Sequence, residues 1–258
     1  MTSIWRNEML NIVVPMAGRG SRFAKEGYKL PKPLIDVHGK HMIEVVINNL
    51  TPKQAHRFIF VCQNEHIEEF KLKEVFSQAC SNYEVVGIDG ITEGAAVTVL
   101  KAREFIDTDE PLMIANSDQW VDMDINDYLL DMERRNLDGT MLTMKADDPK
   151  WSYAKVDENG MVSEVVEKVV ISDEATVGIY NFRNGKEFCR LADEMIRKDI
   201  RSNGEFYVAP VYTFLAQKGG KIGVFNIGKE AEGMYGLGIP SDLELFLGLD
   251  VSKKATNF

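Results

Sequence analysis

The chain has 258 residues, of which 45% are hydrophobic and 27% are charged, and its formal net charge is −10. The acidic balance argues against a nucleic-acid surface, because binding a phosphate backbone requires a basic face. No apolar run approaches the ~18 residues that cross a bilayer, and the first ten residues lack the apolar core of a signal peptide. We therefore expect a cytoplasmic protein without membrane partners, with a core large enough for one α/β domain.

The three cysteines, Cys62, Cys80 and Cys189, are odd in number and widely spaced, and they do not have metal-ligand spacing. This pattern is typical of a reduced compartment and of a fold without disulfides. An anionic small substrate remains compatible with the acidic chain if one pocket carries local positive charge.

The first predicted element is a buried strand at Ile12–Val14, which runs into a glycine-rich turn. Gly18 and Gly20 remove side chains where backbone N–H groups would approach an anion closely. Charge and hydrogen-bond donors in the turn come from Arg19, Ser21 and Arg22. The pattern favours a phosphate-binding loop.

Lys32 follows the turn between two prolines that fix its backbone, so its ammonium can serve as a point charge on a phosphate. A dinucleotide-binding dehydrogenase is the obvious competitor, but its third glycine would fall at Phe23. The turn is also predicted to run on to the P-K-P sequence at residues 31–33 without opening a helix. Both points count against the dehydrogenase.

G-x-G-[ST]-R followed about ten residues later by P-K-P resembles the signature of the sugar-phosphate nucleotidylyltransferases, the pyrophosphorylases that make nucleotide sugars. The resemblance spans residues 11–248. It implies that Ala17 and the glycine loop, with Arg22, hold the triphosphate of an NTP and that Lys32 contacts the α-phosphate. It also implies a Rossmann-like three-layer α/β/α fold, with a mixed, mainly parallel sheet and a small antiparallel extension, in a single domain over residues 1–258.

The following segment alternates strands and helices about every thirty residues, which predicts right-handed crossovers and a mainly parallel sheet. A short strand is expected at Leu34–Val37. The expected helices are His41–Leu50, Glu65–Ala79 and Ala95–Phe105, and the expected strands are Arg57–Cys62, Tyr83–Ile88 and Pro111–Ala115.

Glu93 and Gly94 lie between the third strand and its helix, where the resembling family holds the nucleotide base. A carboxylate accepts hydrogen bonds, so Glu93 would favour a base edge with an amino or imino N–H. A structural interpretation is compatible with this role: Thr92 caps the helix, and Glu93 is a favourable first-turn acid.

Asp118 follows the strong strand that ends at Ala115. An acid at the carboxyl end of a parallel strand lies in the ligand-binding crevice of an open sheet. The resembling family has a Mg²⁺-binding Asp here, and carboxylate oxygen suits a hard cation that binds with phosphate. Asp122 and Asp124 are weaker candidates, because Asp124 is better explained as the N-cap of a helix over residues 125–135.

The segment from Trp151 to Lys168 predicts two strands joined by a turn at Asp157–Gly160, where the sheet becomes antiparallel. It resembles the family region in which a Glu contacts sugar hydroxyls and a Lys contacts the sugar phosphate. Glu167 and Lys168 match these positions, although a surface ion pair would also explain them. The family's glycine and proline are replaced by Ala154 and Val169, so an altered acceptor pocket is expected.

Gly178 resembles a family strand glycine that lets the sugar approach the backbone; a strand glycine also marks bulges. Helices are expected at residues 185–198 and 208–217, and the last strand at residues 221–226. Residues 203–207 resemble a family segment near the acceptor site.

The resemblance continues at residues 235–243, with one departure: Gly236 stands where a second metal-binding Asp is often found. Asp242 is retained and is a second candidate metal ligand. Ser241 and Glu244 have the spacing of a capping box, which would make Asp242 an ordinary first-turn acid.

The resemblance implies Mg²⁺-dependent condensation of an NTP with a sugar 1-phosphate to give a nucleotide sugar and pyrophosphate. Relatives make precursors of cell-surface glycans. Two alternatives stay open. One is the same chemistry on a non-sugar phosphate such as phosphocholine, with CTP, motivated by Ala154 and Val169. The other is a non-catalytic nucleotide-binding relative, motivated by Gly236. Assembly into a homo-oligomer is compatible with the sequence.

Overall fold

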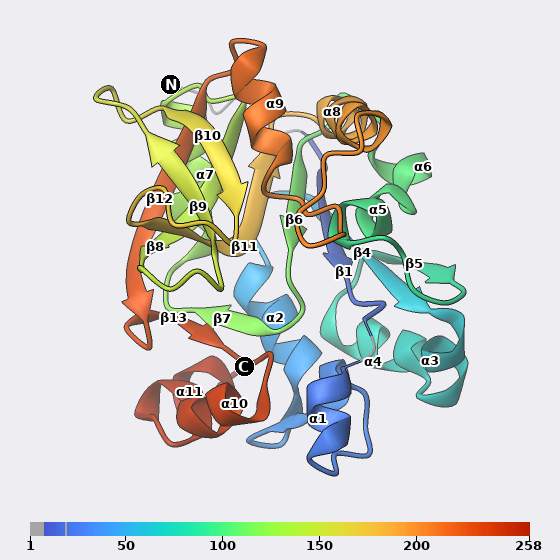
Figure 1. Cartoon of the computed structure of the whole chain (residues 1–258). Helices are drawn as coiled ribbons and strands as arrows, with labels where there is room; N and C mark the ends of the chain where they lie inside the picture. Colours follow the sequence, from blue (N-terminus) through green and yellow to red (C-terminus); the bar gives the residue numbers. More distant parts are fainter. Residues whose placement is uncertain (1–7, 19) are drawn as a thin grey trace.

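The described part of the chain forms one mixed sheet of eleven strands with helices on both faces (Figure 1). The structure is a computed structural model and describes residues 8–18 and 20–258. The strands of this sheet are β1 (Leu10–Pro15), β4 (His56–Gln63), β5 (Tyr83–Ile88), β6 (Leu112–Ala115), β7 (Gln119–Val121), β8 (Gly139–Lys145), β9 (Ser152–Val156), β10 (Val162–Glu167), β11 (Glu174–Phe182), β12 (Ile222–Glu230) and β13 (Gly233–Gly236).

The helices pack on the two faces of this sheet (Figure 1), and the described residues also form a separate two-stranded sheet. That small sheet consists of β2 (Asp36–Val37) and β3 (Lys40–His41), next to the 3₁₀ helix η2 (Lys32–Leu34). The α-helices are α1 (Ser21–Lys25), α2 (Met42–Leu50), α3 (Asn64–Glu69), α4 (Leu72–Ala79), α5 (Ala95–Leu100), α6 (Arg103–Ile106), α7 (Ile125–Arg134), α8 (Gly185–Arg197), α9 (Val211–Gln217), α10 (Pro240–Leu247) and α11 (Asp250–Ala255).

The strand order of the main sheet is β5-β4-β1-β6-β11-β8-β12-β13-β7. The strands β5, β4, β1 and β6 run parallel, and β11 is antiparallel to β6 and β8. The hairpin of β9 and β10 joins the sheet through β11, with Tyr153 opposite Ala175. The predicted fold class, a mainly parallel α/β/α arrangement with a small antiparallel extension, is therefore confirmed.

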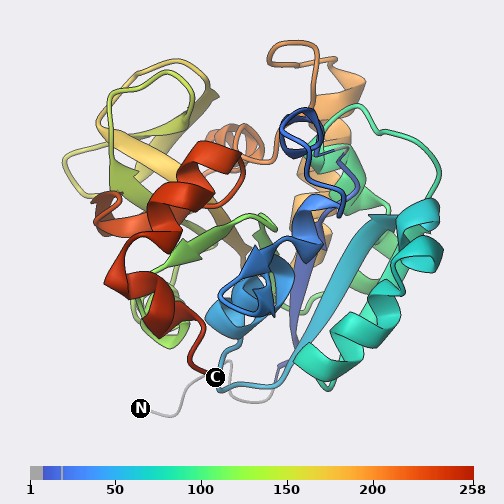
Figure 2. The same cartoon turned by 90° about the horizontal axis from the view of Figure 1, so that it is seen from below.

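Alternating side chains of β1 fill two separate cores, as expected for a strand covered on both faces. Ile12 and Val14 pack in the cluster under α2, α4 and α7, whereas Val13 faces the cluster under α5, α8 and α9. The two helical layers are separated by the sheet in the view from below (Figure 2). A third cluster joins α1 to α10 through Phe23 and Phe246.

The carboxyl ends of β1, β4, β5 and β6 lie at one edge of the sheet, because these strands are parallel. The start of β11 reaches the same edge, since Ile179 pairs with Ala115, the last residue of β6. The loops that begin after Pro15, Ile88 and Ala115 therefore meet there, which is where an open α/β sheet binds ligands.

Several predicted elements differ from the structure. A helix, α1, opens directly at Ser21, although the turn was expected to run on to residues 31–33 without one. The expected helix over residues 65–79 is broken at Lys71, whose left-handed backbone (φ 50°) ends α3 and begins α4. The expected helix over residues 95–105 is likewise divided into α5 and α6. The strands β7 and β13 were not predicted, because three or four residues carry too little periodicity.

None of the helices in the described part of the chain combines the length and the apolarity that a bilayer crossing requires.

Candidate active site

The turn after β1 leaves the backbone accessible where a ligand would approach it. A Cβ at Gly18 would have no atom within 4 Å, so nothing in the described structure covers this peptide. Ala17 is buried, and its carbonyl accepts a hydrogen bond from Gln63 Nε2 at 2.7 Å. Gly20 has φ +58°, the left-handed conformation that glycine adopts without strain, and it caps α1. Arg19 lies outside the described residues.

Ser21 and Arg22 begin α1 on the exposed side of this turn. Burial raises the pKa of the Asp242 carboxyl, and the charge of Arg22 is one of the smaller influences that act in the opposite direction. Arg22 thus lies on the same side of the molecule as the acids of the site, with its side chain exposed to solvent.

Lys32 and Asp118 form an ion pair across 86 positions of sequence. The Lys32 Nζ lies 2.7 Å from Asp118 Oδ2, and each side chain is 24% exposed. Pro31 holds extended backbone (φ −60°, ψ 148°) before η2, as the prolines around Lys32 predict. Gly20 packs against Lys32, because a Cβ there would lie 3.4 Å from Lys32 Cβ. Gly20, Lys32 and Asp118 therefore lie next to one another.

The Asp118 carboxylate is also confined by the loop that follows β13. The backbone N–H of Leu237 donates a hydrogen bond to the backbone carbonyl of Asp118 at 2.8 Å. A Cβ on Gly238 would lie only 2.6 Å from Asp118 Oδ2, closer than real Cβ contacts. Gly238 is thus the residue that permits the carboxylate to sit where Lys32 reaches it.

We expect Gly238→Ala to lower kcat/KM by about 10- to 100-fold, because the added methyl displaces a carboxylate that must be positioned to within a fraction of an ångström. Gly248→Ala, at the end of α10, is the matched control, since its Cβ would lie at an ordinary 3.5 Å from the nearest atom. Steady-state kinetics and thermal unfolding of both variants check the prediction. Equal losses in the two variants would contradict it.

Asp242 lies beside the same loop, in the first turn of α10. A Cβ on Gly236 would lie 3.3 Å from Asp242 Oδ2, so this carboxylate is next to the position where a side chain of residue 236 would begin. Burial raises the pKa of Asp242. The predicted capping box is wrong: α10 begins at Pro240 with Ile239 as its N-cap, which places Ser241 inside the helix.

The carboxylates of Asp118 and Asp242, which both lie beside the loop after β13, fit Mg²⁺, which binds in nucleotide enzymes through one or two carboxylates plus phosphate oxygens and water. Within residues 8–18 and 20–258, no group of three or more His, Cys, Asp or Glu side chains has metal-binding spacing. A metal held by Asp118 and Asp242 would therefore depend on the nucleotide for its remaining ligands.

The two weaker candidates, Asp122 and Asp124, have other partners. Asp124 caps α7, as predicted, and Asp122 pairs with Lys254.

The segment with Glu93 and Gly94 is clamped by the loop before α9. Phe206 N donates to Glu93 O at 2.8 Å, and a Cβ on Gly94 would lie 2.5 Å from Phe206 O, which explains the glycine. The Glu93 carboxylate accepts a hydrogen bond from Arg201 Nη2 at 2.6 Å. Thr92 does not cap the helix as expected: Gly94 is the N-cap, and Thr92 Oγ1 donates to the Gly94 carbonyl.

A cavity of about 300 Å³ opens beside Pro15, between the end of β6 and the start of β11. Glu167 and Lys168 both line it. Glu167 is 8% exposed and accepts a hydrogen bond from Ser152 Oγ. Burial raises the pKa of Glu167, while the Ser152 hydrogen bond and the Lys168 charge act in the opposite direction.

Lys168 has left-handed backbone (φ 58°), and its Nζ donates to Tyr207 OH at 2.8 Å. This hydrogen bond is the main reason that the pKa of Lys168 is raised. Glu167 is buried and Lys168 points to a tyrosine, so the two are not a simple surface ion pair. Both face the cavity with unused hydrogen-bonding capacity.

Gly178 lies in this cavity wall with φ +78°, inside a register shift between β11 and β8. A Cβ there would overlap Asn116 Nδ2 at 2.1 Å. The glycine therefore marks a bulge and also a close approach by Asn116, a neighbour of Asp118 that the sequence did not single out.

Other residues of the site were missed because their partners are distant in sequence. Lys150, Trp151, Ser152 and Tyr207 line the same cavity as Glu167, and Arg201 forms an ion pair with Glu93. A resemblance to the family around residues 203–207 was noted, and this segment does carry Tyr207 to the cavity. In the sequence, nothing except its place in the motif at residues 235–243 pointed to Gly238.

Comparison with known proteins agrees with this geometry. A family model described as nucleotidyl transferase matches residues 12–205. The chain belongs to this family. Among curated proteins it is 28% identical over 228 residues to the bifunctional protein GlmU of Staphylococcus carnosus, covering 83% of this chain and 46% of that protein. The chain spans about half the length of the curated relatives it matches.

Solved members of the family share the fold. A nucleoside-diphosphate-sugar pyrophosphorylase of Vibrio cholerae RC9 superposes with a TM-score of 0.76 at 26% identity, covering 92% of this chain and all of that one. A UDP-glucose pyrophosphorylase solved with UDP-glucose gives a TM-score of 0.74 at 16% identity, with coverage of 91% and 95%. The predicted resemblance to sugar-phosphate nucleotidylyltransferases is confirmed at the level of the family.

Proposed function

We propose that the protein condenses an NTP with a sugar 1-phosphate, in the presence of Mg²⁺, to give a nucleotide sugar and pyrophosphate. The observation that carries the proposal is the Lys32–Asp118 pair, which lies between an open glycine loop and a polar cavity. We propose that residues 1–258 form one domain with a core of about residues 11–248. We also propose that the reaction takes place in the cytoplasm, where nucleotides are available.

In this proposal an oxygen of the acceptor phosphate attacks the α-phosphorus, and the bond from that phosphorus to the bridging oxygen breaks to release pyrophosphate. No side chain has to act as a covalent nucleophile, so the rate acceleration comes from positioning the substrates and neutralising their charge. The amides of the glycine loop and Arg22 bind the β- and γ-phosphates, and Lys32 contacts the α-phosphate. Asp118 and Asp242 would hold Mg²⁺, which neutralises charge on the phosphates when it is bound.

The acceptor cavity favours a sugar phosphate over phosphocholine. Three aromatic side chains line it, as in sites for quaternary ammonium groups. However, Lys150 Nζ lies 4.9 Å from the centre of the Trp151 ring, and Lys168 Nζ lies 4.9 Å from that of Tyr207. One ammonium group thus already lies at the Trp151 ring and a second at the Tyr207 hydroxyl, and both charges would repel choline. The buried Glu167 carboxylate suits hydroxyl donors instead.

The non-catalytic alternative rests on Gly236, where a second metal ligand is expected. Asp242 lies beside that position. A second carboxylate is therefore still near the loop after β13, although residue 236 is a glycine. Tight nucleotide binding without Mg²⁺-dependent turnover would support the non-catalytic reading.

The decisive experiment measures pyrophosphate release with Mg²⁺, using the four common NTPs and dTTP crossed with a panel of sugar 1-phosphates and phosphocholine. Turnover in one combination establishes the chemistry and identifies the base and the acceptor together. Turnover with phosphocholine alone would overturn the sugar assignment. Nucleotide binding with no turnover in any combination would count against catalysis on these acceptors.

We expect Glu167→Gln to raise the acceptor KM about tenfold with little change in kcat, because it removes a charged hydrogen-bond acceptor from the cavity. Glu164→Gln is the matched control, since Glu164 is exposed on the same strand.

Because the pKa of Glu167 is raised, this carboxylate protonates at a higher pH than an ordinary glutamate as the solution is acidified. The acceptor KM of the unaltered protein should therefore rise as the pH falls. Glu167→Gln has no carboxyl to titrate at this position, so this contribution to the pH dependence is absent. Identical KM profiles against pH for the two proteins would contradict the role of Glu167.

A further inference from the structure

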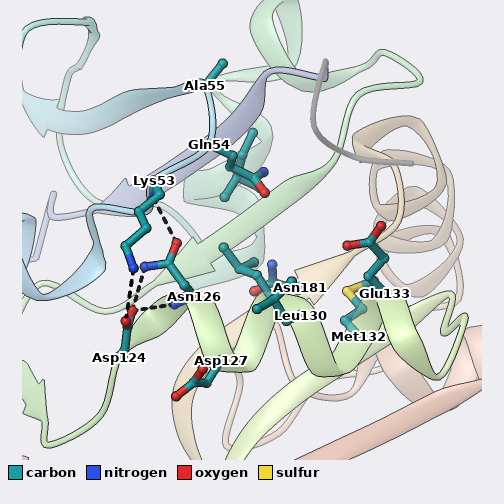
Figure 3. A pocket seen from close by; sticks show the side chains of 12 residues that line it. Lys53, Gln54, Ala55, Asp124, Asn126, Asp127, Leu130, Met132, Glu133 and Asn181 are labelled. Atoms are coloured by element: carbon teal, nitrogen blue, oxygen red, sulfur yellow. Dashed lines mark hydrogen bonds and ion pairs between the residues drawn. The ribbon is translucent and has the colours of Figure 1, made fainter. Parts of the chain in front are cut away.

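Two cavities of the described structure share no lining residue. One lies beside α7 and is lined by Lys53, Asp124 and Leu130 (Figure 3), and the other is the acceptor cavity beside Pro15. In the first, Lys53 Nζ lies 3.8 Å from Asp124 Oδ2, and Asp124 caps α7, so these two charged groups already have partners. The acceptor cavity differs because a buried carboxylate, that of Glu167, lines it.

Glu167 on β10 lies directly opposite Ser152 on β9 in the antiparallel hairpin. Opposed side chains of such a pair lie on the same face of the sheet, with their Cβ atoms ~5 Å apart, so the serine hydroxyl can reach the carboxylate. Ser152 Oγ donates to Glu167 Oε2, whereas Oε1 accepts no hydrogen bond among the described residues. Oε1 nevertheless keeps accessible surface, and Glu167 lines the cavity. This oxygen is therefore available to a ligand.

Two further hydroxyl groups extend this contact into the cavity wall. The Tyr180 OH lies 2.9 Å from Thr176 Oγ1. Burial raises the pKa of Tyr180, and hydrogen bonds with Thr176 and Ser152 act in the opposite direction. The side chains of Ser152, Thr176 and Tyr180 are all buried, and all three line the acceptor cavity. Together with Glu167 they form one chain of hydrogen bonds.

The carboxylate at the end of this chain decides the direction of each bond. An ionised carboxylate can only accept, so Ser152 uses its single proton on Glu167. Tyr180 must then be the donor to Ser152, and Thr176 the donor to Tyr180. A hydroxyl that accepts a hydrogen bond becomes a stronger donor, so the chain strengthens the bond at Oε2. The terminal torsion of a free glutamate is broad, and this bond restricts it.

We propose that Ser152 and Tyr180 are positioning residues, which hold Glu167 by Oε2 so that Oε1 is presented to a hydroxyl group of the acceptor. The acceptor hydroxyl donates to Oε1 and completes the chain. An acceptor that lacks a donor at this point leaves the open oxygen of a buried carboxylate without a partner, which costs binding free energy. The inference rests on the proposed function, because it takes the acceptor to be a sugar 1-phosphate.

The first measurement needs no substrate. Carbon-13 NMR of the glutamate carboxyl groups in the full chain follows the titration of Glu167, whose signal is assigned by its loss in Glu167→Gln. The pKa of Glu167 should rise in Ser152→Ala, because a hydrogen bond to the charged form is lost. It should not change in Ser163→Ala, at an exposed serine of the same hairpin. The other charged groups that act on this carboxyl, Lys168 and Glu205, are kept in both variants. An unchanged pKa in Ser152→Ala would overturn the inference.

The second measurement compares kcat and KM with the acceptor identified by pyrophosphate release. We expect Ser152→Ala to raise the acceptor KM about tenfold, with kcat and the NTP KM within about twofold of the unaltered protein. In a Glu167→Ala background the same change should have no further effect, because Ser152 acts only through Glu167. A further tenfold rise in that background would mean that Ser152 acts independently of Glu167, which contradicts the inference.

A second variant, Tyr180→Phe, keeps the bond between Ser152 and Glu167 and so covers a loss of folding in Ser152→Ala. It should raise the acceptor KM about threefold and leave the NTP KM unchanged, because Ser152 becomes a weaker donor. An unchanged acceptor KM would contradict the role of Tyr180. If the unaltered protein turns over no sugar 1-phosphate, the proposed function is wrong, and the NMR titration alone then decides whether the chain holds Glu167.

Discussion

Replacing Lys32 by methionine is expected to lower kcat at least about 100-fold while the fold is retained, because one preorganised charge at a reacting phosphate is worth about this much. The side chain is partly exposed and methionine matches its length, so unfolding is not expected. Lys29→Met, an exposed lysine three residues earlier, is the control. Pyrophosphate release and circular dichroism of both variants check the result; near-normal turnover in Lys32→Met would remove Lys32 from the mechanism.

The same variant has a second expected effect, on metal binding without nucleotide. In the described structure the Lys32 ammonium lies 2.7 Å from Asp118 Oδ2, so a cation at this carboxylate competes with the lysine. Lys32→Met should therefore bind Mn²⁺ more tightly than the unaltered protein when no NTP is present. Titration followed by electron paramagnetic resonance measures this affinity, and a weaker affinity in the variant would contradict the competition.

Asp118→Asn is expected to cause the other large loss, at least about 1,000-fold in kcat. Asparagine keeps the shape but removes the negative charge that would hold Mg²⁺ and that pairs with Lys32. Asp122→Asn, on the same segment but paired with Lys254, is the control and should stay within about threefold. Kinetics at saturating NTP, with a Mn²⁺ titration, compare the two variants, and equal losses would point to a general effect of the substitution.

The double variant Lys32→Met/Asp118→Asn should lose much less than the product of the two single losses. Residues that act as a unit are strongly non-additive, and these two are in direct contact. Strict multiplication of the two losses would mean that they act independently.

Much of the architecture follows from local patterns. The buried strand before Gly18 and the regular alternation of strand and helix up to Ala115 were enough to predict a mainly parallel sheet. The ligand site after β1 and β6 stays a prediction. These signals are strong because a strand covered on both faces must be apolar throughout. The turn at Asp157–Gly160 and the Asp124 cap were also correct, since each depends only on neighbouring residues.

The contacts that organise the site could not be predicted in the same way. Lys32 and Asp118 were chosen separately, and nothing local indicates that they form an ion pair. The clash that makes Gly238 necessary, and the nearness of Asp242 to Gly236, arise only when the loop after β13 returns to β7. The predicted capping box at Ser241 failed because Pro240 already serves as the first helical residue, which moves the cap back to Ile239.

The ion pair between Lys32 and Asp118 also has a kinetic consequence. In the proposed mechanism a free Mg²⁺ competes with the Lys32 ammonium for Asp118, and a free phosphate competes with the Asp118 carboxylate for Lys32. A metal–nucleotide complex satisfies both partners in one event, because it brings a cation and an anion together. The initial velocity should therefore follow the concentration of the Mg²⁺–NTP complex, and excess free Mg²⁺ or inorganic phosphate should inhibit only weakly.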